Sequence, residues 1–152
     1  MQKEYEVIIA DTSCLILLDK IGELGLLKSI FGLVTVTQEI AYEFGNDLPE
    51  WFTIRFIEKP NSQYVFDLDP GEASAIALAL ELERVLLVLD DFKARKVAQK
   101  AGIDITGTLG LFLKAKHLSI ISSVRPLLEK IQQTNFRYSQ KVFDQILTMA
   151  GE

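Results

Sequence analysis

The chain has 152 residues, of which 49% are hydrophobic and 24% are charged, a composition typical of one globular domain and unlike collagen, disordered chains or coiled coils. Its apolar runs are too short to span a membrane and its first residues lack a signal-peptide pattern, so we expect a soluble, cytoplasmic protein. Cys14 and His117 are the only residues of their types, which excludes an intrachain disulfide and a cysteine-based zinc site.

The net charge of −5 is distributed unevenly along the chain. Residues 1–91 carry a net charge of −11, residues 92–117 carry +5 and residues 118–152 carry +1. An acidic body therefore adjoins a short cationic segment. The overall negative charge argues against a polyanionic partner, but a local cationic segment of this kind can bind a phosphate backbone.

The first half of the chain alternates short apolar runs with amphipathic segments. Apolar runs of about four residues predict strands buried on both faces, which are typical of a parallel sheet. In chain order, the pattern predicts a strand at residues 7–10, a helix from 12 to at least 18, a strand at 33–36, a helix at 38–44, an edge strand at 54–57 and a loop at 61–68.

The second half begins with a strong helix start, because Asp69 is a suitable N-cap, Pro70 suits the first helical position and Glu72 the third. This helix is apolar on nearly all sides, which indicates burial. The remaining pattern predicts strands at 85–89 and 103–105 and helices at 92–101, 108–117, 124–132 and 139–149. Together these elements predict one domain over residues 1–152, a three-layer α/β/α sandwich with a mainly parallel sheet, on which a helical tail, 118–152, packs.

Acidic residues occur where the predicted strands end and where the following helices begin. The carboxyl ends of parallel strands meet at one edge of a sheet, where α/β proteins bind ligands, so we expect these side chains to lie together. Two carboxylates about 4 Å apart repel by on the order of 4 kcal/mol at an effective dielectric of 20. A hard cation with oxygen ligands, Mg²⁺ or Mn²⁺, would offset that repulsion. The residues are Asp11, Glu39, Glu72, Asp90 and Asp91.

Each of these acids also has a purely structural interpretation. Asp11 and one member of the aspartate pair can act as N-caps, and Glu72 can complete a capping box. Glu39 can complement a helix dipole. Glu43, one turn later, is a rival for the functional role of Glu39.

Four segments of the sequence together resemble the PIN-domain family, in particular its small prokaryotic toxin-like (VapC-type) branch. The resemblance covers residues 5–120 and extends to the helical tail. Two departures matter: the third acid of the family is often Asp and is Glu72 here, and the doubled aspartate leaves open which member faces a metal ion. The segments are VIIADTSCLILL, LDPGEASAIALALE, LLVLDDFKARKVAQKAG and ITGTLGLFLKAK.

The resemblance implies a Mg²⁺- or Mn²⁺-dependent ribonuclease, often the toxin of a toxin–antitoxin pair restrained by a small antitoxin protein. By position, the four catalytic acids of the family would correspond to Asp11, Glu39, Glu72 and Asp91. The metal ligands would be Asp11, Glu72 and one or both of Asp90 and Asp91. The ions would activate water for attack on an RNA phosphodiester.

Hydroxyl and cationic side chains near these acids are candidates for contacts with RNA. Ser13 and Thr106 could hydrogen-bond a phosphate or a metal-bound water, although simple capping also explains such hydroxyls. The basic residues could neutralise phosphates or could form an ordinary solvated helix face. These candidates are Lys93, Arg95 and Lys96.

Two further expectations concern partners and the rival function. The apolar stripe of the last helix is either core or a surface for an antitoxin or for a second copy in a homodimer. The alternative to a nuclease is a catalytically silent RNA-binding module whose acids are structural. Metal-dependent cleavage of RNA distinguishes the two.

Overall fold

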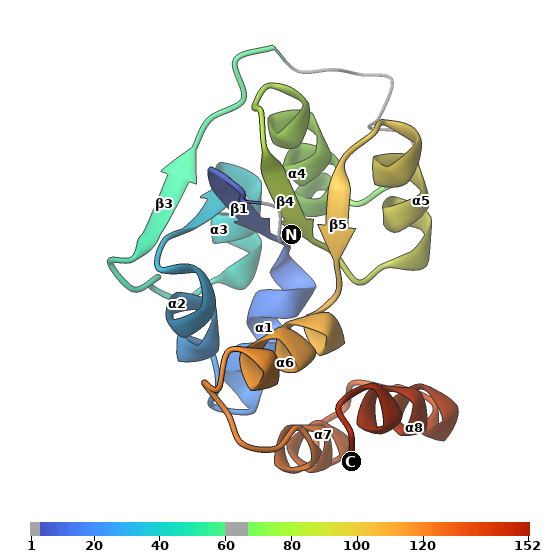
Figure 1. Ribbon diagram of the computed structural model, residues 1–152. Coiled ribbons are helices and arrows are strands. Elements are labelled where there is room, and N and C mark those ends of the chain that lie inside the picture. The colour runs from blue at the N-terminus through green and yellow to red at the C-terminus, as the bar shows by residue number, and fades with distance from the viewer. Residues whose placement is uncertain (1–3, 60–66) are drawn as a thin grey trace.

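Five parallel strands form the centre of the molecule in the computed structural model, which describes residues 4–59 and 67–152 (Figure 1). The order across the sheet is β3-β2-β1-β4-β5. The strand bounds are β1 Val7–Ala10, β2 Val34–Thr37, β3 Phe52–Arg55, β4 Val85–Val88 and β5 Asp104–Thr106. All residues of β1, β2 and β4 are buried, as their continuous apolar runs predict. The predicted α/β class with a parallel sheet is confirmed.

Helices follow most strands and cover the sheet, with α4 packed across β1, β2 and β4. Local sequence signals account for several helix starts: Thr37 caps α3, Asp91 caps α5, and Asp69 with Glu72 forms a capping box at α4. The helix bounds are α1 Thr12–Lys20, α2 Gly25–Phe31, α3 Gln38–Phe44, α4 Pro70–Leu80, α5 Phe92–Lys100, α6 Thr108–His117, α7 Arg125–Gln132 and α8 Gln140–Met149.

The structure differs from the sequence predictions in one additional helix and in the starting residues of three strands, of which β5 starts at residue 104 instead of 103. Helix α2 was not expected, because it has only seven residues and no side-chain cap marks its start. Strand β3 lies two residues before the predicted 54–57, since Ile54 and Phe56 are apolar but 46% and 66% exposed. Strand β2, in contrast, starts one residue after the predicted residue 33, because Leu33 is 68% exposed. Most of the predicted loop at 61–68 lies outside the described residues.

The buried core continues from the sheet into the C-terminal helices, which lie beyond α6 in Figure 1. Leu127, Leu128 and Ile131 of α7 are buried in it, and so is Phe143 of α8. Phe143 also stacks on Tyr138, with ring centroids 5.6 Å apart. The apolar stripe of α8 therefore contributes to the core. None of the helices in residues 4–59 and 67–152 combines the length and the apolar character that crossing a bilayer requires.

The Glu152 side chain joins the end of the chain to the start of α7. Its carboxylate accepts hydrogen bonds from the backbone N–H groups of Val124 (2.7 Å) and Arg125 (3.2 Å), from Ser123 Oγ and from Lys116 Nζ (3.1 Å). An anion at this position suits the positive end of the helix dipole. The hydrogen bonds from Ser123 and then from Val124 lower the pKa of Glu152 to about 2.

Replacing this carboxylate should lower thermal stability in a pH-dependent way. A lowered pKa in the folded state contributes stability that is complete above the ordinary value of 4.5 and is lost as the pH falls towards 2. We expect Glu152→Gln to lower the Tm at pH 7 by on the order of 2–5 °C and the two melting curves to converge near pH 2. Glu129→Gln, on the exposed side of α7, is the matched control. A pH-independent difference would contradict this role.

Candidate metal-dependent active site

Strands β1, β2 and β4 end at the same edge of the sheet, because they are parallel and in register. Ile9 pairs with Thr35, and Ala10 pairs with Val88. The chain then enters Asp11 after β1, α3 after β2, and Leu89 and Asp90 after β4. Helix α4 adds its first turn to this edge, since the charges of Asp69 and Asp11 influence each other there. Topology thus brings acidic residues that are distant in sequence to one edge.

Asp11 is the most deeply buried acid at this edge, with 2% of its surface exposed. It occupies the N-cap position of α1, yet its side chain makes no capping hydrogen bond. Its Oδ1 is buried and has no hydrogen-bond partner within the described part of the chain, while Oδ2 lies 3.5 Å from Ser13 Oγ. Burial raises the pKa of Asp11 from 3.8 to about 7; a hydrogen bond from the Thr12 backbone opposes this shift, and the charges of Asp69, Glu43 and Asp90 add to it. The capping interpretation therefore does not explain this side chain.

Glu72 is also buried, with 8% exposed, but it has a structural function as well. Glu72 N–H donates to Asp69 Oδ1 (2.8 Å), and the Asp69 N–H donates over a longer 3.4 Å to Glu72 Oε1. Burial raises the pKa of Glu72 to about 7, and the charges of Asp69, Asp91 and Asp11 add to the effect. Glu72 thus closes a capping box and shares the electrostatic environment of Asp11.

Glu43, and not Glu39, is the α3 residue that contacts the first turn of α1. Thr12 Oγ1 donates a hydrogen bond of 2.6 Å to Glu43 Oε1. Gly71 permits this arrangement, because a Cβ atom at that position would overlap Glu43 Oε1 and lie 3.0 Å from Thr12 Oγ1. Glu39 lies one turn earlier on α3, where it is exposed and lines a surface cavity. The structure thus places Glu43 in contact with α1, and the catalytic role predicted for Glu39 stays a prediction.

The two aspartates after β4 act at two different helix starts. Asp90 accepts two hydrogen bonds from Thr108 at the start of α6, from its N–H (2.8 Å) and from its Oγ1 (2.5 Å). Asp91 Oδ2 accepts the Ala94 N–H (2.9 Å) and caps α5. The charge of Asp90 acts on Asp11, and the charge of Asp91 acts on Glu72. Both aspartates therefore flank the buried acids while they stabilise helices.

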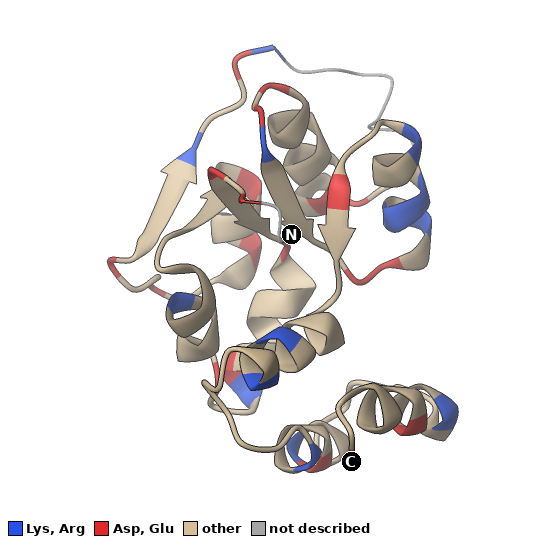
Figure 2. Ribbon diagram, in the orientation of Figure 1, with Lys and Arg blue, Asp and Glu red and all other residues tan. Residues whose placement is uncertain are grey.

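The predicted RNA-binding residues have mixed environments. The Ser13 hydroxyl lies beside Asp11. The hydroxyl of Thr108, two residues after the predicted Thr106, donates a hydrogen bond to Asp90. Arg95 Nη1 donates a hydrogen bond to the Leu89 carbonyl (2.9 Å), so this side chain has a structural role. The other two cations lie on the exposed surface of α5, which follows the acidic residues 90–91 directly (Figure 2). Lys93 Nζ lies 3.7 Å from Asp67, and Lys96 Nζ lies 4.7 Å from the centre of the Phe92 ring.

Sequence reasoning missed one member of this cluster and ranked another too low. Asp69 was interpreted only as a helix cap. Among the neighbouring charges, however, that of Asp69 raises the pKa of Asp11 and of Glu72 the most. Glu43 was only a rival to Glu39. Its position one turn from the start of α3 gave no signal that its side chain would reach back to α1, because that contact depends on the space left by Gly71 on another helix.

The donor set of this edge fits a small divalent cation. No group of three or more His, Cys, Asp or Glu side chains in residues 4–59 and 67–152 is arranged to hold a metal ion. Mg²⁺, however, is usually bound through one or two carboxylates and keeps several waters. Asp11 offers a buried oxygen without a partner, and the pKa values of Asp11 and Glu72 are raised first by burial and then by the negative charge of neighbouring acids. A cation at this edge would relieve both features.

Comparison with known proteins identifies the family of this chain. A family model described as a PIN domain matches residues 7–152, which is nearly the whole chain. No curated protein and no solved structure gives a significant match. The match includes every acid of the site described above, together with the C-terminal helices. The chain belongs to the PIN domain family.

Proposed function

We propose that this protein is a Mg²⁺- or Mn²⁺-dependent ribonuclease whose metal is held at the acidic edge by Asp11 and Glu72. PIN domains are in general nucleases that use divalent metal ions. The observation that carries the proposal is Asp11 Oδ1, a buried carboxylate oxygen that lacks a partner in the described residues and is surrounded by other acids. A buried carboxylate oxygen without a hydrogen-bond partner is costly to the folded state, which favours a functional over a purely structural role for Asp11.

The residues around the site have distinct functions in this proposal. When bound, the ion would lower the pKa of a water molecule and neutralise charge on the phosphoryl oxygens. Asp11 and Glu72 would bind it, and the carboxylates of Glu43 and Asp69 would hold solvent in place around it. Asp90, fixed by Thr108, would add negative charge that strengthens cation binding.

The surface of α5 would bind the RNA backbone next to the acids. Lys93 and Lys96 are exposed cations on α5, two and five residues after Asp91 in the sequence. They would neutralise phosphates, so affinity should decrease steeply as salt concentration rises. Arg95, which is fixed to the Leu89 carbonyl, would contribute charge without leaving its position.

Incubation of the purified protein with single-stranded RNA tests the proposal. We expect cleavage with Mn²⁺ or Mg²⁺ and none with EDTA. The same ions should raise the Tm, because a ligand at a hundredfold excess over its Kd stabilises the folded state by about 2.7 kcal/mol. Equal degradation with EDTA, or an unchanged Tm, would contradict metal-dependent cleavage at this site.

Gly71→Ala should test whether the position of the Glu43 side chain matters for activity, with little effect on the stability of the fold. The added methyl group would displace the flexible end of Glu43 and break its hydrogen bond with Thr12. Alanine favours the helix by about 0.8–1 kcal/mol and the lost hydrogen bond costs about 0.5–1.5 kcal/mol, so stability should change by less than about 1 kcal/mol. We expect kcat/KM for RNA to fall on the order of tenfold.

Gly25→Ala is the matched control for this substitution. Gly25 also lies in the first turn of a helix, and a Cβ atom there would meet no atom within 4 Å. Its kcat/KM should equal that of the wild type. Full activity of Gly71→Ala would exclude a function for the Thr12–Glu43 contact.

The helix-capping functions of the acids support a second candidate, a catalytically silent RNA-binding module. Asp69, Asp90 and Asp91 each accept hydrogen bonds that stabilise a helix start. This candidate predicts RNA binding without cleavage and no Tm increase with Mn²⁺. It does not explain why Asp11 is buried without a capping bond, which favours the nuclease.

The proposal includes the cellular role that the motifs suggest, a toxin that acts on cytoplasmic RNA and is restrained by a small antitoxin protein. The support for it is the resemblance of the segments around Asp11, Glu72 and Asp90 to the toxin-like branch. Induced expression in bacteria should arrest growth with the wild-type chain and not with Asp11→Asn. Equal growth with both chains would contradict the toxin role and leave RNA cleavage in vitro unaffected.

A further inference from the structure

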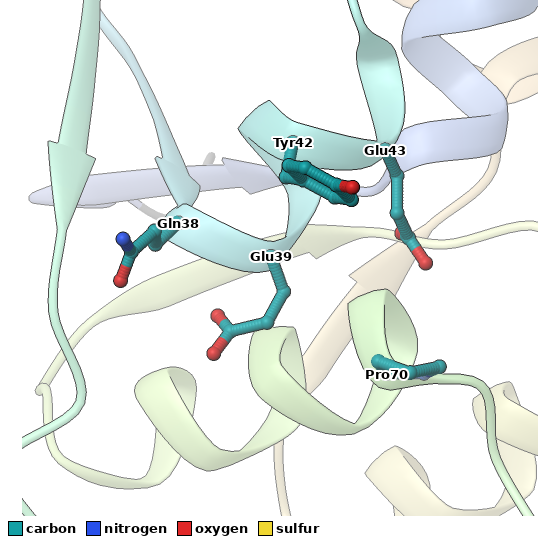
Figure 3. Close-up of a pocket in the computed structure, with 5 residues that line it drawn as sticks. All are labelled: Gln38, Glu39, Tyr42, Glu43 and Pro70. Carbon is teal, nitrogen blue, oxygen red and sulfur yellow. The ribbon is translucent and has the colours of Figure 1, made fainter.

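A surface cavity of about 510 Å³ lies beside the acidic edge, between α3 and the start of α4 (Figure 3). This volume is within the range of about 300–1,000 Å³ that small-molecule sites occupy. In Figure 3 the side chains of Glu39 and Glu43 extend from α3 toward α4, and Pro70 lies at the start of α4. Most of the lining surface is apolar. The lining residues are Gln38, Glu39, Tyr42, Glu43 and Pro70.

Tyr42 is the exposed aromatic side chain of this cavity, with 86% of its surface accessible. It is not needed for the core, because α3 is anchored by the buried side chains of Ile40 and Phe44 on its other face. Gln38 and Glu39 lie four and three residues before it, so all three share one side of the helix. An aromatic face, an amide and two carboxylates are therefore presented together.

The chemistry of this lining selects among possible occupants. Glu39 and Glu43 would repel a phosphate group, which excludes the RNA backbone from the cavity. A nucleobase is neutral and planar, can stack on an aromatic ring, and can donate hydrogen bonds from its edge. A protein interface usually buries about 800 Å² per partner, which exceeds what five lining residues provide. The base of a single-stranded RNA is the occupant that fits best.

We propose that Tyr42 is a stacking platform for one unpaired base of the RNA and that Glu39 selects a base that carries an amino group, with guanine preferred over uracil. Guanine offers two adjacent N–H donors to the two oxygens of a carboxylate, whereas uracil offers one N–H between two carbonyl groups. Glu43 connects the cavity to the site, because it both lines the cavity and bonds Thr12 beside Asp11. This inference rests on the proposed function, since it takes RNA as the substrate.

Binding of fluorescently labelled RNA tests the proposal without relying on cleavage. The probes are a uridine dodecamer and a dodecamer with guanosine at alternate positions, and Asp11→Asn serves as the background so that RNA remains intact. In this background we expect Tyr42→Ala to raise the Kd for the guanosine probe by about 5- to 150-fold. Tyr42→Phe should stay within about twofold. Glu39→Gln should remove the preference for guanosine and leave binding of the uridine probe nearly unchanged.

Phe56→Ala is the matched control. Phe56 is an exposed aromatic residue, 66% accessible, that lines a different cavity with Leu80 and Glu81. Its Kd should match that of the background. An unchanged Kd for Tyr42→Ala overturns the proposal.

The outcome also separates this inference from the proposed function. RNA binding that depends on Tyr42, in a wild-type chain that never cleaves RNA, would support the base site and contradict the nuclease. Cleavage that proceeds with the same KM in Tyr42→Ala would support the nuclease and contradict the base site.

Discussion

Asp11→Asn is expected to lower the rate of metal-dependent RNA cleavage by about 10²- to 10³-fold. Asparagine preserves the shape of the side chain and removes the negative charge that would hold the cation. Asp90 cannot replace it, because both of its carboxylate oxygens already accept hydrogen bonds from Thr108. The measurement is kcat/KM on single-stranded RNA with saturating Mn²⁺.

Asp19→Asn is the control for this experiment. Asp19 lies on the same helix and undergoes the same change of charge, but it is exposed and outside the acidic cluster. It should retain wild-type activity. If Asp11→Asn cleaves RNA as fast as Asp19→Asn, the metal is not held where we propose.

Asp11→Asn should also stabilise the metal-free protein at alkaline pH. A carboxyl whose pKa is about 7 in the folded state and 3.8 in the unfolded state lowers the free energy of unfolding by on the order of 4 kcal/mol once it is ionised in both. Asparagine avoids this cost but still leaves a buried polar atom unpaired. We therefore expect Asp11→Asn to gain about 1–3 kcal/mol at pH 8 in EDTA, a rise in Tm of roughly 2–10 °C.

The pH dependence of this gain identifies its cause. Because the folded-state pKa of Asp11 is raised, the wild type is destabilised progressively as the pH rises from about 4 to 7. Below pH 4 the carboxyl is protonated in both states, so the advantage of asparagine should disappear. Urea unfolding at pH 4 and pH 8 measures this difference. A destabilised Asp11→Asn at pH 8, or a gain independent of pH, would contradict an unpaired buried carboxylate.

The sequence was most informative about the fold where local and global signals agree. Apolar runs located β1 and β4 to within one residue, and the capping box located the start of α4. It was least informative about α2, a seven-residue helix between Gly25 and Gly32 without a side-chain cap. Such a short helix depends on tertiary packing, here through buried Leu26 and Leu27, which periodicity over seven residues cannot show.

Topology allowed the acidic edge to be predicted, but the orientation of individual side chains could not be. Parallel strands predict that Asp11 and Asp90 lie close together, and their charges do interact. The contact of Glu43 with Thr12 depends on the space at Gly71, and the bonds from Thr108 to Asp90 depend on how α6 meets β4. These contacts join segments up to 31 residues apart and involve rotamers, which spacing alone does not determine.

A crystal structure of the protein with Mn²⁺, with anomalous scattering used to locate the ion, tests the central claim most directly. We predict an anomalous peak within coordination distance of Asp11 Oδ1 and of the Glu72 carboxylate, and no peak at this position in Asp11→Asn crystals. A wild-type structure in which Mn²⁺ binds elsewhere, with Oδ1 of Asp11 still unpaired, would contradict it.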